Sequence, residues 1–485
     1  MTRTLNIRSV LHVLGFMVFI LGLMMLIPLG ISLLYQDGSS AGILVALLVT
    51  SASGGLIYLF FKQEKELGLR DGFLIVGLGW FLMAWFGSLP YFFSGAIPSF
   101  TDCFFEAMSG FTTTGASILN DIEQMPAALL FWRAFTHWIG GMGIIVLSLA
   151  ILPLLGVGGM QLFKAEVPGP TADKLTPRIA ETARILWLVY VGITLLEVIF
   201  LLFGGMSLLD AFCHAFATMA TGGFSTRNAS IGAFNSTYFD YVIIFFMFAA
   251  GTNFALHYKF IMRKFNAYWK NFEFKTYLGI LFIAAAAITL SNLLGGIYNN
   301  LSDSLRYGLF QAVSIGTTTG FCTADYETWT PLAQILLFIL MFIGGSAGST
   351  GGAMKVVRLI IVVKHTFIEL KKLIHPQAVI PLRVGNQVIP KEVTLSVIGF
   401  FLLYVLLFVI ISIVMTFMGM DLLTAAGASA SCLGNIGPGL GNVGPADNFA
   451  WMPIPAKWIL AITMMVGRLE IYTVLVIFTK GLWAK

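Results

Sequence analysis

Four short stretches rich in threonine and glycine recur along the chain, and their chemistry suggests how it could handle an ion. Glycine permits backbone conformations that other residues avoid, so such a stretch can turn several carbonyl oxygens in one direction. Four stretches around one axis would form rings of oxygen that replace the hydration shell of a monovalent cation. The stretches are Thr112-Thr113-Thr114-Gly115, Ala220-Thr221-Gly222-Gly223, Thr317-Thr318-Thr319-Gly320 and Cys432-Leu433-Gly434-Asn435.

Each of the four stretches lies at the end of a window of similar sequence, and each window belongs to a repeated unit. Ungapped alignment on Gly115, Gly223, Gly320 and Gly434 places an alanine at one matched position in every window: Ala107, Ala215, Ala312 and Ala426. An aspartate stands at another matched position in three windows, as Asp102, Asp210 and Asp421, with Tyr307 in the third window. Glycine and threonine also allow close packing of membrane helices, which is the alternative interpretation of a single copy. The matched spacing of four copies favours a common structure.

Composition identifies the setting in which these stretches must lie. Of 485 residues, 58% are hydrophobic and 11% are charged, and the mean hydropathy is +0.89. A soluble domain carries about 25% charged residues, so soluble catalytic, secreted and nucleic-acid-binding classes are excluded. The four cysteines are widely spaced and suggest neither a zinc site nor a redox motif. No covalent or catalytic cofactor is expected, and the chain is predicted to be a polytopic membrane protein.

Apolar runs flank every window. The runs before the windows cover about residues 73–93, 183–204, 277–298 and 394–419, and those after them about 127–155, 238–262, 331–363 and 453–479. A windowed helix of ~11 residues spans ~16 Å, too short for ~30 Å of hydrocarbon. Each unit is therefore predicted to be a span, a re-entrant half-helix and a span.

An additional hairpin, Leu11–Leu34 and Ile43–Phe61, precedes the four units. The expected fold is all-α: four pseudo-symmetric units of helix, pore loop and helix (M1–pore loop–M2) around one pore, with about ten spans and four half-helices in all. The predicted divisions are 1–70 for the hairpin, then 71–163, 164–270, 271–380 and 381–485 for the repeats.

Charge along the chain predicts the orientation. Twelve acids and four bases (Arg133, Arg227, Arg306, Lys457) fall in the segments between the basic clusters, a formal charge of −8. Basic segments remain cytoplasmic, so both termini are expected inside and the acidic segments outside. One interpretation of this bias is that it reflects insertion topology alone. The other is that an acidic mouth also raises the local concentration of cations.

Two further features lie deep in apolar runs. One is a glycine-rich interruption, which is predicted to break its helix because each glycine costs ~1 kcal/mol relative to alanine. The other is Arg468, whose charge costs at least ~2.5 kcal/mol at that depth and must face protein or water. Arg468 either pairs with Glu470 or loop carbonyls, or forms a cationic barrier. The interruption, either a packing kink or a movable obstruction, is Gly344, Gly345, Ser346, Ala347, Gly348, Ser349, Thr350, Gly351 and Gly352.

Several polar residues are predicted to support the stretches rather than bind ions. Glu106, His214 and Gln311 occupy one matched position and are expected to hold the loops. Glu197 is expected to bond a neighbouring helix. The pairs Ser99/Asp102 and Ser207/Asp210 supply N-cap chemistry for the short helices.

The motifs GFTTTGAS (110–117), ATGGFST (220–226), GTTTGFCT (316–323) and SCLGNIGPG (431–439) resemble those of the Trk/Ktr/HKT superfamily of potassium uptake proteins, most of all its bacterial TrkH/TrkG-type subunits. The resemblance implies a non-enzymatic K⁺ pore, also passing Rb⁺, in the bacterial inner membrane. It implies that residues 344–352 and Arg468 form a gate. It also implies a homodimer and a cytosolic TrkA-type regulatory ring, with NAD(H) or ATP/ADP bound only on that ring. The alternative on the same fold is a symporter coupling K⁺ to H⁺ or Na⁺.

Overall fold

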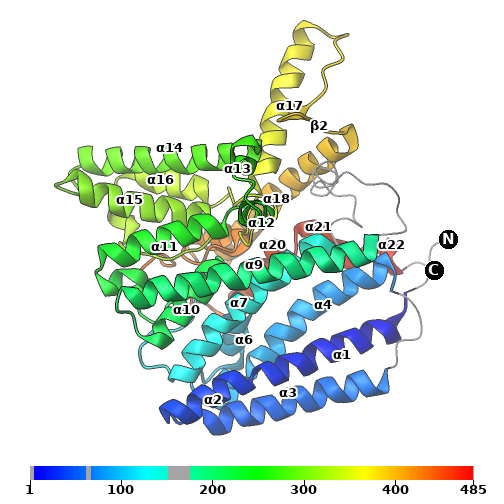
Figure 1. The fold of residues 1–485 in the computed structure, drawn as a ribbon, viewed down its shortest axis with the longest axis vertical. Coiled ribbons are helices and arrows are strands. Elements are labelled where there is room, and N and C mark those ends of the chain that lie inside the picture. Colours follow the sequence, from blue (N-terminus) through cyan, green and yellow to red (C-terminus); the bar gives the residue numbers. More distant parts are fainter. Residues whose placement is uncertain (1–4, 62–66, 151–174, 484–485) are drawn as a thin grey trace.

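The computed structural model describes residues 5–61, 67–150 and 175–483 (Figure 1). The chain begins with a hairpin of α1 (Ile7–Met24), α2 (Leu26–Tyr35) and α3 (Ser40–Phe60). Small residues bring α1 and α3 together, because a Cβ added at Gly22 or Gly54 would overlap the opposite helix. The predicted N-terminal hairpin is therefore present, with a break at Met25 that divides its first helix.

Four units follow, each with one short helix between longer ones. The first holds α4 (Leu69–Gly87), α5 (Leu89–Phe93), α6 (Phe100–Phe111) and α7 (Ala127–Ala150). The second holds α9 (Leu175–Phe203), α10 (Leu208–Met219), η2 (Ser230–Phe234), α11 (Thr237–Ala250), α12 (Phe254–Ile261) and α13 (Asn266–Lys270). The third holds α14 (Phe272–Leu294), α15 (Leu301–Gly316), η3 (Tyr326–Thr328), α16 (Pro331–Leu340) and α17 (Val356–Ile374).

The fourth unit departs slightly from the all-α prediction. It starts with an antiparallel pair of two-residue strands, β1 (Arg383–Val384) and β2 (Gln387–Val388). Figure 1 shows α17 and this pair standing out from the rest of the helices. The unit continues with α18 (Lys391–Phe417), α19 (Leu422–Gly434), α20 (Ile454–Arg468), α21 (Ile471–Leu475), η4 (Val476–Phe478) and α22 (Lys480–Trp483).

Within the described residues, six helices are long and apolar enough to cross a membrane. The count rises to eight if two bent pairs each form one span: α11 with α12, bent by 101°, and α20 with α21, bent by 116°. The predicted run 331–363 is divided into α16 and α17, as its glycines indicated, whereas the bend after Ala250 was not predicted. The run 127–155 forms α7 and continues past residue 150, outside the described residues.

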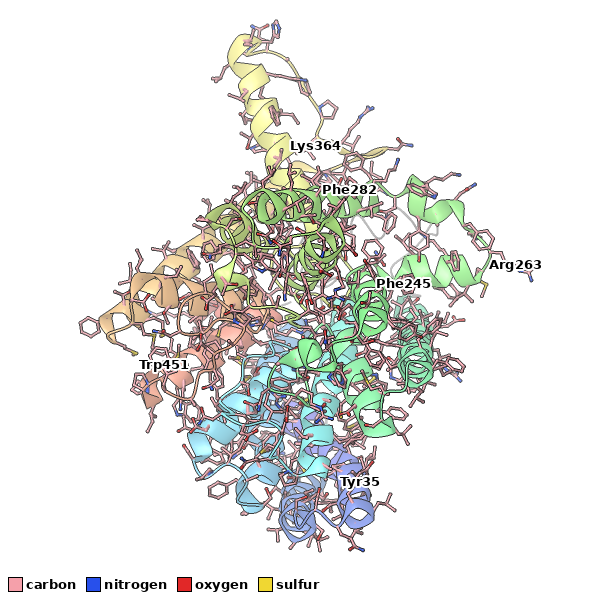
Figure 2. All side chains as sticks on the ribbon, turned by 90° about the vertical axis from the view of Figure 1, so that its left-hand side faces the viewer. Tyr35, Phe245, Arg263, Phe282, Lys364 and Trp451 are labelled. Atoms are coloured by element: carbon pink, nitrogen blue, oxygen red, sulfur yellow. The ribbon has the colours of Figure 1, made fainter. Side chains whose placement is uncertain are left out.

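The short helices occupy the interior. α6 buries nine of its 12 residues and α19 ten of its 13, whereas α18 buries seven of 27. Phe245 on α11 and Phe282 on α14 instead project outward, as expected for residues that face lipid (Figure 2). α7 packs on both α6 and α10, α11 on both α10 and α15, and α20 on both α19 and α6. The last unit therefore closes onto the first, and the short helices form a central group.

Capping of the short helices agrees with the sequence in part. Ser207 caps α10 by accepting a hydrogen bond from the Asp210 amide, and Asp421 caps α19 in the same way. Ser99 precedes α6 without a side-chain cap, and Asp102 forms an ion pair with Lys457 of α20 at 2.6 Å. α15 starts earlier than predicted, with Asn300 as its cap.

Candidate functional site

All four short helices end in the same backbone turn. In each, an amide two or three residues beyond the helix donates to a carbonyl of the last turn, five residues back along the chain, and the residue just before that amide adopts a left-handed conformation. The bonds are Thr114 N to Ser109 O (2.9 Å), Gly222 N to Ala217 O (2.8 Å), Thr319 N to Ser314 O (2.8 Å) and Ile436 N to Ser431 O (3.0 Å). The left-handed residues are Thr113, Thr221, Thr318 and Asn435.

This turn corrects the predicted alignment of the fourth stretch. In each unit a second positive φ follows two residues after the first, at Gly115 (84°), Gly223 (79°), Gly320 (80°) and Gly437 (104°). Gly437, not Gly434, is therefore the equivalent glycine. Cys432, Leu433 and Gly434 lie in the last turn of α19, and only Gly434 and Asn435 of the predicted residues belong to the segment. The four ring segments are Thr112–Gly115, Ala220–Gly223, Thr317–Gly320 and Gly434–Gly437.

The four segments surround one axis. A methyl group added to Gly115 would overlap the carbonyl oxygen of Gly222, one on Gly223 that of Thr319, and one on Gly320 that of Ile436. The circuit closes because a methyl group on Gly437 would lie 2.9 Å from the oxygen of Thr114. Each glycine thus faces the carbonyl just before the glycine of the next segment, and a closed ring is formed.

The side chains of the ring are alike in the first and third segments but differ in the second and fourth. The hydroxyls of Thr112 and Thr114 lie 2.8 Å apart in the first segment, and those of Thr317 and Thr319 lie 2.7 Å apart in the third. The second and fourth segments have no threonine at these positions. The fourth is instead tied to the first by Asn435, whose amide donates to the Thr114 hydroxyl (2.9 Å) and to the carbonyl of Met464 (2.8 Å).

The predicted supports of three segments hold the chain just beyond the glycine. The buried Glu106 carboxylate accepts from the Ile118 amide (2.9 Å), from Ser117 and from Arg133. His214 bonds the Ser225 hydroxyl through Nε2 (2.9 Å). The Gln311 amide faces the backbone of the corresponding residues 321–323 of the third unit. These contacts confirm that the three side chains hold the loops.

The predicted outer side is dominated by carboxylates. Of the twelve acids assigned to this side, five pair with its four bases. The other seven form no ion pair with any described residue. Asn228 donates to Asp121 (3.0 Å) and lowers the pKa of that carboxyl, so it stays charged at neutral pH. The four bases of this side all pair with its acids: Arg133 with Glu106, Arg227 with Asp210, Arg306 with Asp240 and Asp303, and Lys457 with Asp102.

Residues 344–352, the glycine loop, lie against the ends of three short helices. The Gly352 amide donates to the Thr318 hydroxyl at 2.6 Å, and the Thr350 hydroxyl donates to the carbonyl of Met219 at 3.0 Å. A methyl group on Gly352 would overlap the carbonyl of Gly434. The loop therefore meets the second, third and fourth units beneath the ring, on the side opposite the loops that the supports hold.

Both sides of the glycine loop are fastened to neighbouring elements. The Ser346 amide donates to the Gly251 carbonyl (2.9 Å) at the bend after α11, and the Ala347 amide donates to Glu273 of α14 (2.7 Å). Ser346, Ser349 and Thr350 are buried. The loop is thus held in one conformation by hydrogen bonds to two neighbouring elements.

Arg468 ends α20 directly beside this loop. It is buried, and its Nη1 donates to the carbonyl of Thr350 at 2.6 Å. Its Nε and Nη2 have no hydrogen-bond partner among the described residues. The predicted structural alternative was pairing with Glu470 or with loop carbonyls. The bond to the Thr350 carbonyl agrees with the second of these, whereas Glu470 pairs with Arg358 of α17 at 2.6 Å. An unneutralised guanidinium therefore lies beneath the ring and binds the loop.

Comparison with known proteins agrees with this architecture. Residues 39–483 match the TrkH family, described as cation transport proteins. The chain belongs to the TrkH family. It is 42% identical to the Trk system potassium uptake protein TrkH of Escherichia coli K12, over 99% of this chain and 100% of that protein. It is 36% identical to Escherichia coli TrkG, over 99% of both chains. The crystal structure of the potassium transporter TrkH from Vibrio parahaemolyticus superposes with a TM-score of 0.92 at 39% identity, covering 99% of this chain and 100% of that one.

Membership of the TrkH family confirms the predicted resemblance, the multi-pass membrane class and the expectation that the chain is not an enzyme. Sequence reasoning missed Ile436 and Gly437 in the fourth segment and Glu273 beside the glycine loop. The signal for Gly437 was the Asn435-Ile436-Gly437 order, since asparagine is the residue besides glycine that most readily turns left-handed at a helix end.

Proposed function

We propose that this TrkH-family chain takes up potassium by conducting dehydrated K⁺, and also Rb⁺, through the ring of four segments. The observation that carries the proposal is the closed circuit of glycine–carbonyl contacts, which brings four equivalent stretches of main-chain oxygen around one axis. Carbonyl rings of this kind replace the hydration shell of K⁺. The negative ends of four half-helices also point toward the ring and favour a cation there.

The ring segments are proposed to bind K⁺ through Thr112–Gly115, Ala220–Gly223, Thr317–Gly320 and Gly434–Gly437. The acidic outer side supplies cations to this ring. The repeats 71–163, 164–270, 271–380 and 381–485, with the hairpin 1–70, are the units that surround the proposed pore.

The glycine loop and Arg468 are proposed as the gate. The loop fills the space beneath the ring, and the guanidinium adds an electrostatic barrier. An ion passing within about 4 Å of a unit positive charge is repelled by about 4 kcal/mol at an effective dielectric constant of 20. That barrier corresponds to roughly a thousandfold slower passage. Conduction therefore requires both the loop and Arg468 to move.

A cytosolic TrkA-type ring that binds NAD(H) or ATP/ADP is proposed to move the loop, and the chain is proposed to act as a homodimer in the bacterial inner membrane with both termini in the cytoplasm. α17 starts only four residues after the glycine loop and stands out from the helix bundle (Figure 1). A partner that binds α17 could therefore act directly on the loop.

A coupled K⁺/H⁺ or K⁺/Na⁺ symporter is the second candidate. It is favoured by one observation, the fully buried Glu197 carboxyl of α9 beside Thr218 of α10. A buried acid next to a short helix is a candidate proton carrier. A channel gives currents that reverse at the K⁺ Nernst potential at every pH, whereas proton coupling shifts the reversal potential with the pH gradient.

The test is Arg468→Ala in liposomes that contain no regulatory partner. We expect K⁺ flux to rise relative to the wild type because the barrier and the loop's hydrogen bond are both removed. Arg383→Ala, at an exposed arginine of β1, is the matched control and should leave flux unchanged. A folded Arg468→Ala variant with unchanged or lower flux would contradict the gate, and a wild type that binds no K⁺ would contradict the pore.

A further inference from the structure

The segment from Phe254 to Asn271 has the character of a membrane-surface element. α12 turns 101° away from α11, on the side of the chain predicted to be cytoplasmic. Helices that lie in the interface combine bulky apolar residues with lysine and arginine. Five large apolar side chains of this segment are half or more exposed: Phe260 (50%), Ile261 (61%), Met262 (53%), Phe265 (56%) and Trp269 (65%).

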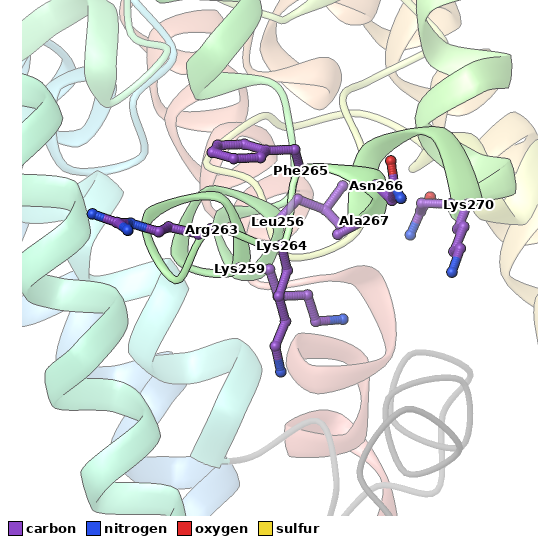
Figure 3. A pocket seen from close by; sticks show the side chains of 9 residues that line it. Leu256, Lys259, Arg263, Lys264, Phe265, Asn266, Ala267 and Lys270 are labelled. Atoms are coloured by element: carbon purple, nitrogen blue, oxygen red, sulfur yellow. The ribbon is translucent and has the colours of Figure 1, made fainter.

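A basic pocket lies on one side of this segment (Figure 3). It encloses about 530 Å³, and none of the described residues that line it is acidic. Two asparagines, Asn266 and Asn271, add polar groups that can contact an anion. Figure 2 shows Arg263 at the outer edge of the molecule, away from the central helices. The basic lining residues are Lys259, Arg263, Lys264 and Lys270.

An apolar groove of about 850 Å³ adjoins the pocket between α9, α11 and α12. Its walls include Leu188, Leu196 and Phe245. His257, the one histidine among the described residues that line the groove, is hydrogen-bonded to the Tyr268 hydroxyl and to the Ala249 carbonyl. The two sites share one stretch of chain, since residues 260–262 line the groove and the residues on either side, Lys259 and Arg263, line the pocket.

We propose that this pair of sites binds an anionic phospholipid of the inner leaflet. The headgroup phosphate would contact the basic pocket, and an acyl chain would lie in the apolar groove. A free phosphate ion would leave the groove unused, and the overall neutral headgroup of a zwitterionic lipid would not match the basic side chains of Arg263, Lys264 and Lys270. Basic pockets at the cytoplasmic membrane surface bind anionic headgroups for the same reason.

The lipid site adjoins the glycine loop. The Phe254 amide, at the start of α12, donates to the carbonyl of Gly348 at 3.0 Å, and the Asn253 side chain packs against Gly348. A lipid that holds α12 in place thereby also steadies the loop. This consequence for ion flux rests on the proposed function, whereas lipid binding does not.

The test compares phosphatidylglycerol with phosphatidylcholine binding to the purified full chain by native mass spectrometry. The headgroup variant is Arg263→Gln/Lys264→Gln. Because each basic residue near the surface contributes about fivefold to affinity, we expect about 25-fold weaker phosphatidylglycerol binding. The matched control is Lys371→Gln/Lys391→Gln, which removes two exposed charges outside the pocket and should bind as the wild type does.

A second variant, Leu188→Trp, keeps the charge and fills the groove, so it should weaken binding of both lipids. Size-exclusion profiles of both variants establish that they fold. Three results would each overturn the proposal: undiminished phosphatidylglycerol binding by the headgroup variant, equal affinity of the wild type for the two lipids, or displacement of the lipid by glycerol 3-phosphate. Weaker phosphatidylglycerol binding by the headgroup variant with unchanged K⁺ flux would count against the link to the gate and leave the lipid site standing.

Discussion

In the first three ring segments, a polar side chain of the preceding short helix holds the chain beyond the glycine. The fourth segment lacks that residue, because Ala428 occupies the position of Glu106. It is held instead by Ser431, which donates to the Gly437 carbonyl (2.5 Å), and from the third unit by Tyr326, which donates to that of Gly439 (2.7 Å). The four segments thus share one backbone conformation but are stabilised by different side chains. The fourfold symmetry is therefore found in the main chain, which is proposed to contact the ion, and not in the side chains that support it.

The largest expected effect comes from removing a support of the first segment. Glu106→Ala leaves Arg133 buried without its carboxylate, and breaking a buried pair costs about 3–5 kcal/mol. Ser431→Ala removes one hydrogen bond from the fourth segment and should cost about 1 kcal/mol. Thermal unfolding of the two detergent-solubilised variants measures the difference. Equal destabilisation would show that the fourth segment depends on its own helix as much as the first does.

The next effect concerns the ring itself. Alanine at Gly320 or at Gly437 must adopt a positive φ, but a methyl group at Gly320 also overlaps the Ile436 carbonyl, whereas at Gly437 the nearest atom is 2.9 Å away. Strain of about 2 kcal/mol or more should reduce K⁺ flux by at least about thirtyfold in Gly320→Ala. Gly437→Ala should lose less. Gly279→Ala, which has open space in α14, is the control. Normal flux through Gly320→Ala would contradict the ring.

Exchanging the left-handed residues tests whether the fourth segment depends on its asparagine. Asn435→Thr removes the hydrogen bonds to the Thr114 hydroxyl and the Met464 carbonyl, at a cost of about 1–3 kcal/mol. The reverse change, Thr113→Asn, places a residue that favours this conformation where the hydroxyl has no described partner. Flux and the K⁺/Na⁺ permeability ratio should fall only in Asn435→Thr. The opposite order would mean that the threonine hydroxyls, not the asparagine link, determine selectivity.

The sequence predicted the four units because the apolar runs show the lengths of the spanning helices and the glycine spacing shows where the chain reverses after each short helix. It took Gly434 as the equivalent glycine of the fourth segment, three residues before Gly437, because the stretch from Ser431 to Gly439 contains three glycines and composition cannot show which one follows the helix end. The structure decides through backbone conformation: only Gly437 combines a positive φ with contact to the first segment.

The bend between α11 and α12 escaped prediction for a related reason. Gly251-Thr252-Asn253 interrupts an apolar run only briefly, and its role depends on distant residues. The Gly251 carbonyl accepts from Ser346 of the glycine loop, and Asn253 caps α12 by accepting from the Ala255 amide. Contacts between units therefore set where this helix breaks, while local composition set where the loop in the third unit lies.

The smallest expected effect lies at the outer mouth, where the fourth segment again depends on the third unit. Glu327 accepts from the Gly441 amide at 2.6 Å, and burial, with Asp325 and Asp447 nearby, raises the pKa of its carboxyl. As pH falls from 7 to 5, this residue is therefore protonated before an ordinary glutamate, and the mouth loses charge that attracts cations. Glu327→Gln keeps the hydrogen bond but not the charge.

We expect Glu327→Gln to lower K⁺ uptake at pH 7 by about twofold at low ionic strength, and less at 1 M salt, where the Debye length is only about 3 Å. Its uptake should also vary less between pH 7 and pH 5 than that of the wild type. Asp421→Asn, at a carboxyl whose pKa is lowered by the hydrogen bonds from Thr424, is the control and should keep the wild-type pH dependence over this range. If the loss of uptake in Glu327→Gln does not depend on salt, the residue positions the fourth segment and does not act by attracting cations. The fourth segment would then depend on the third unit for a further contact.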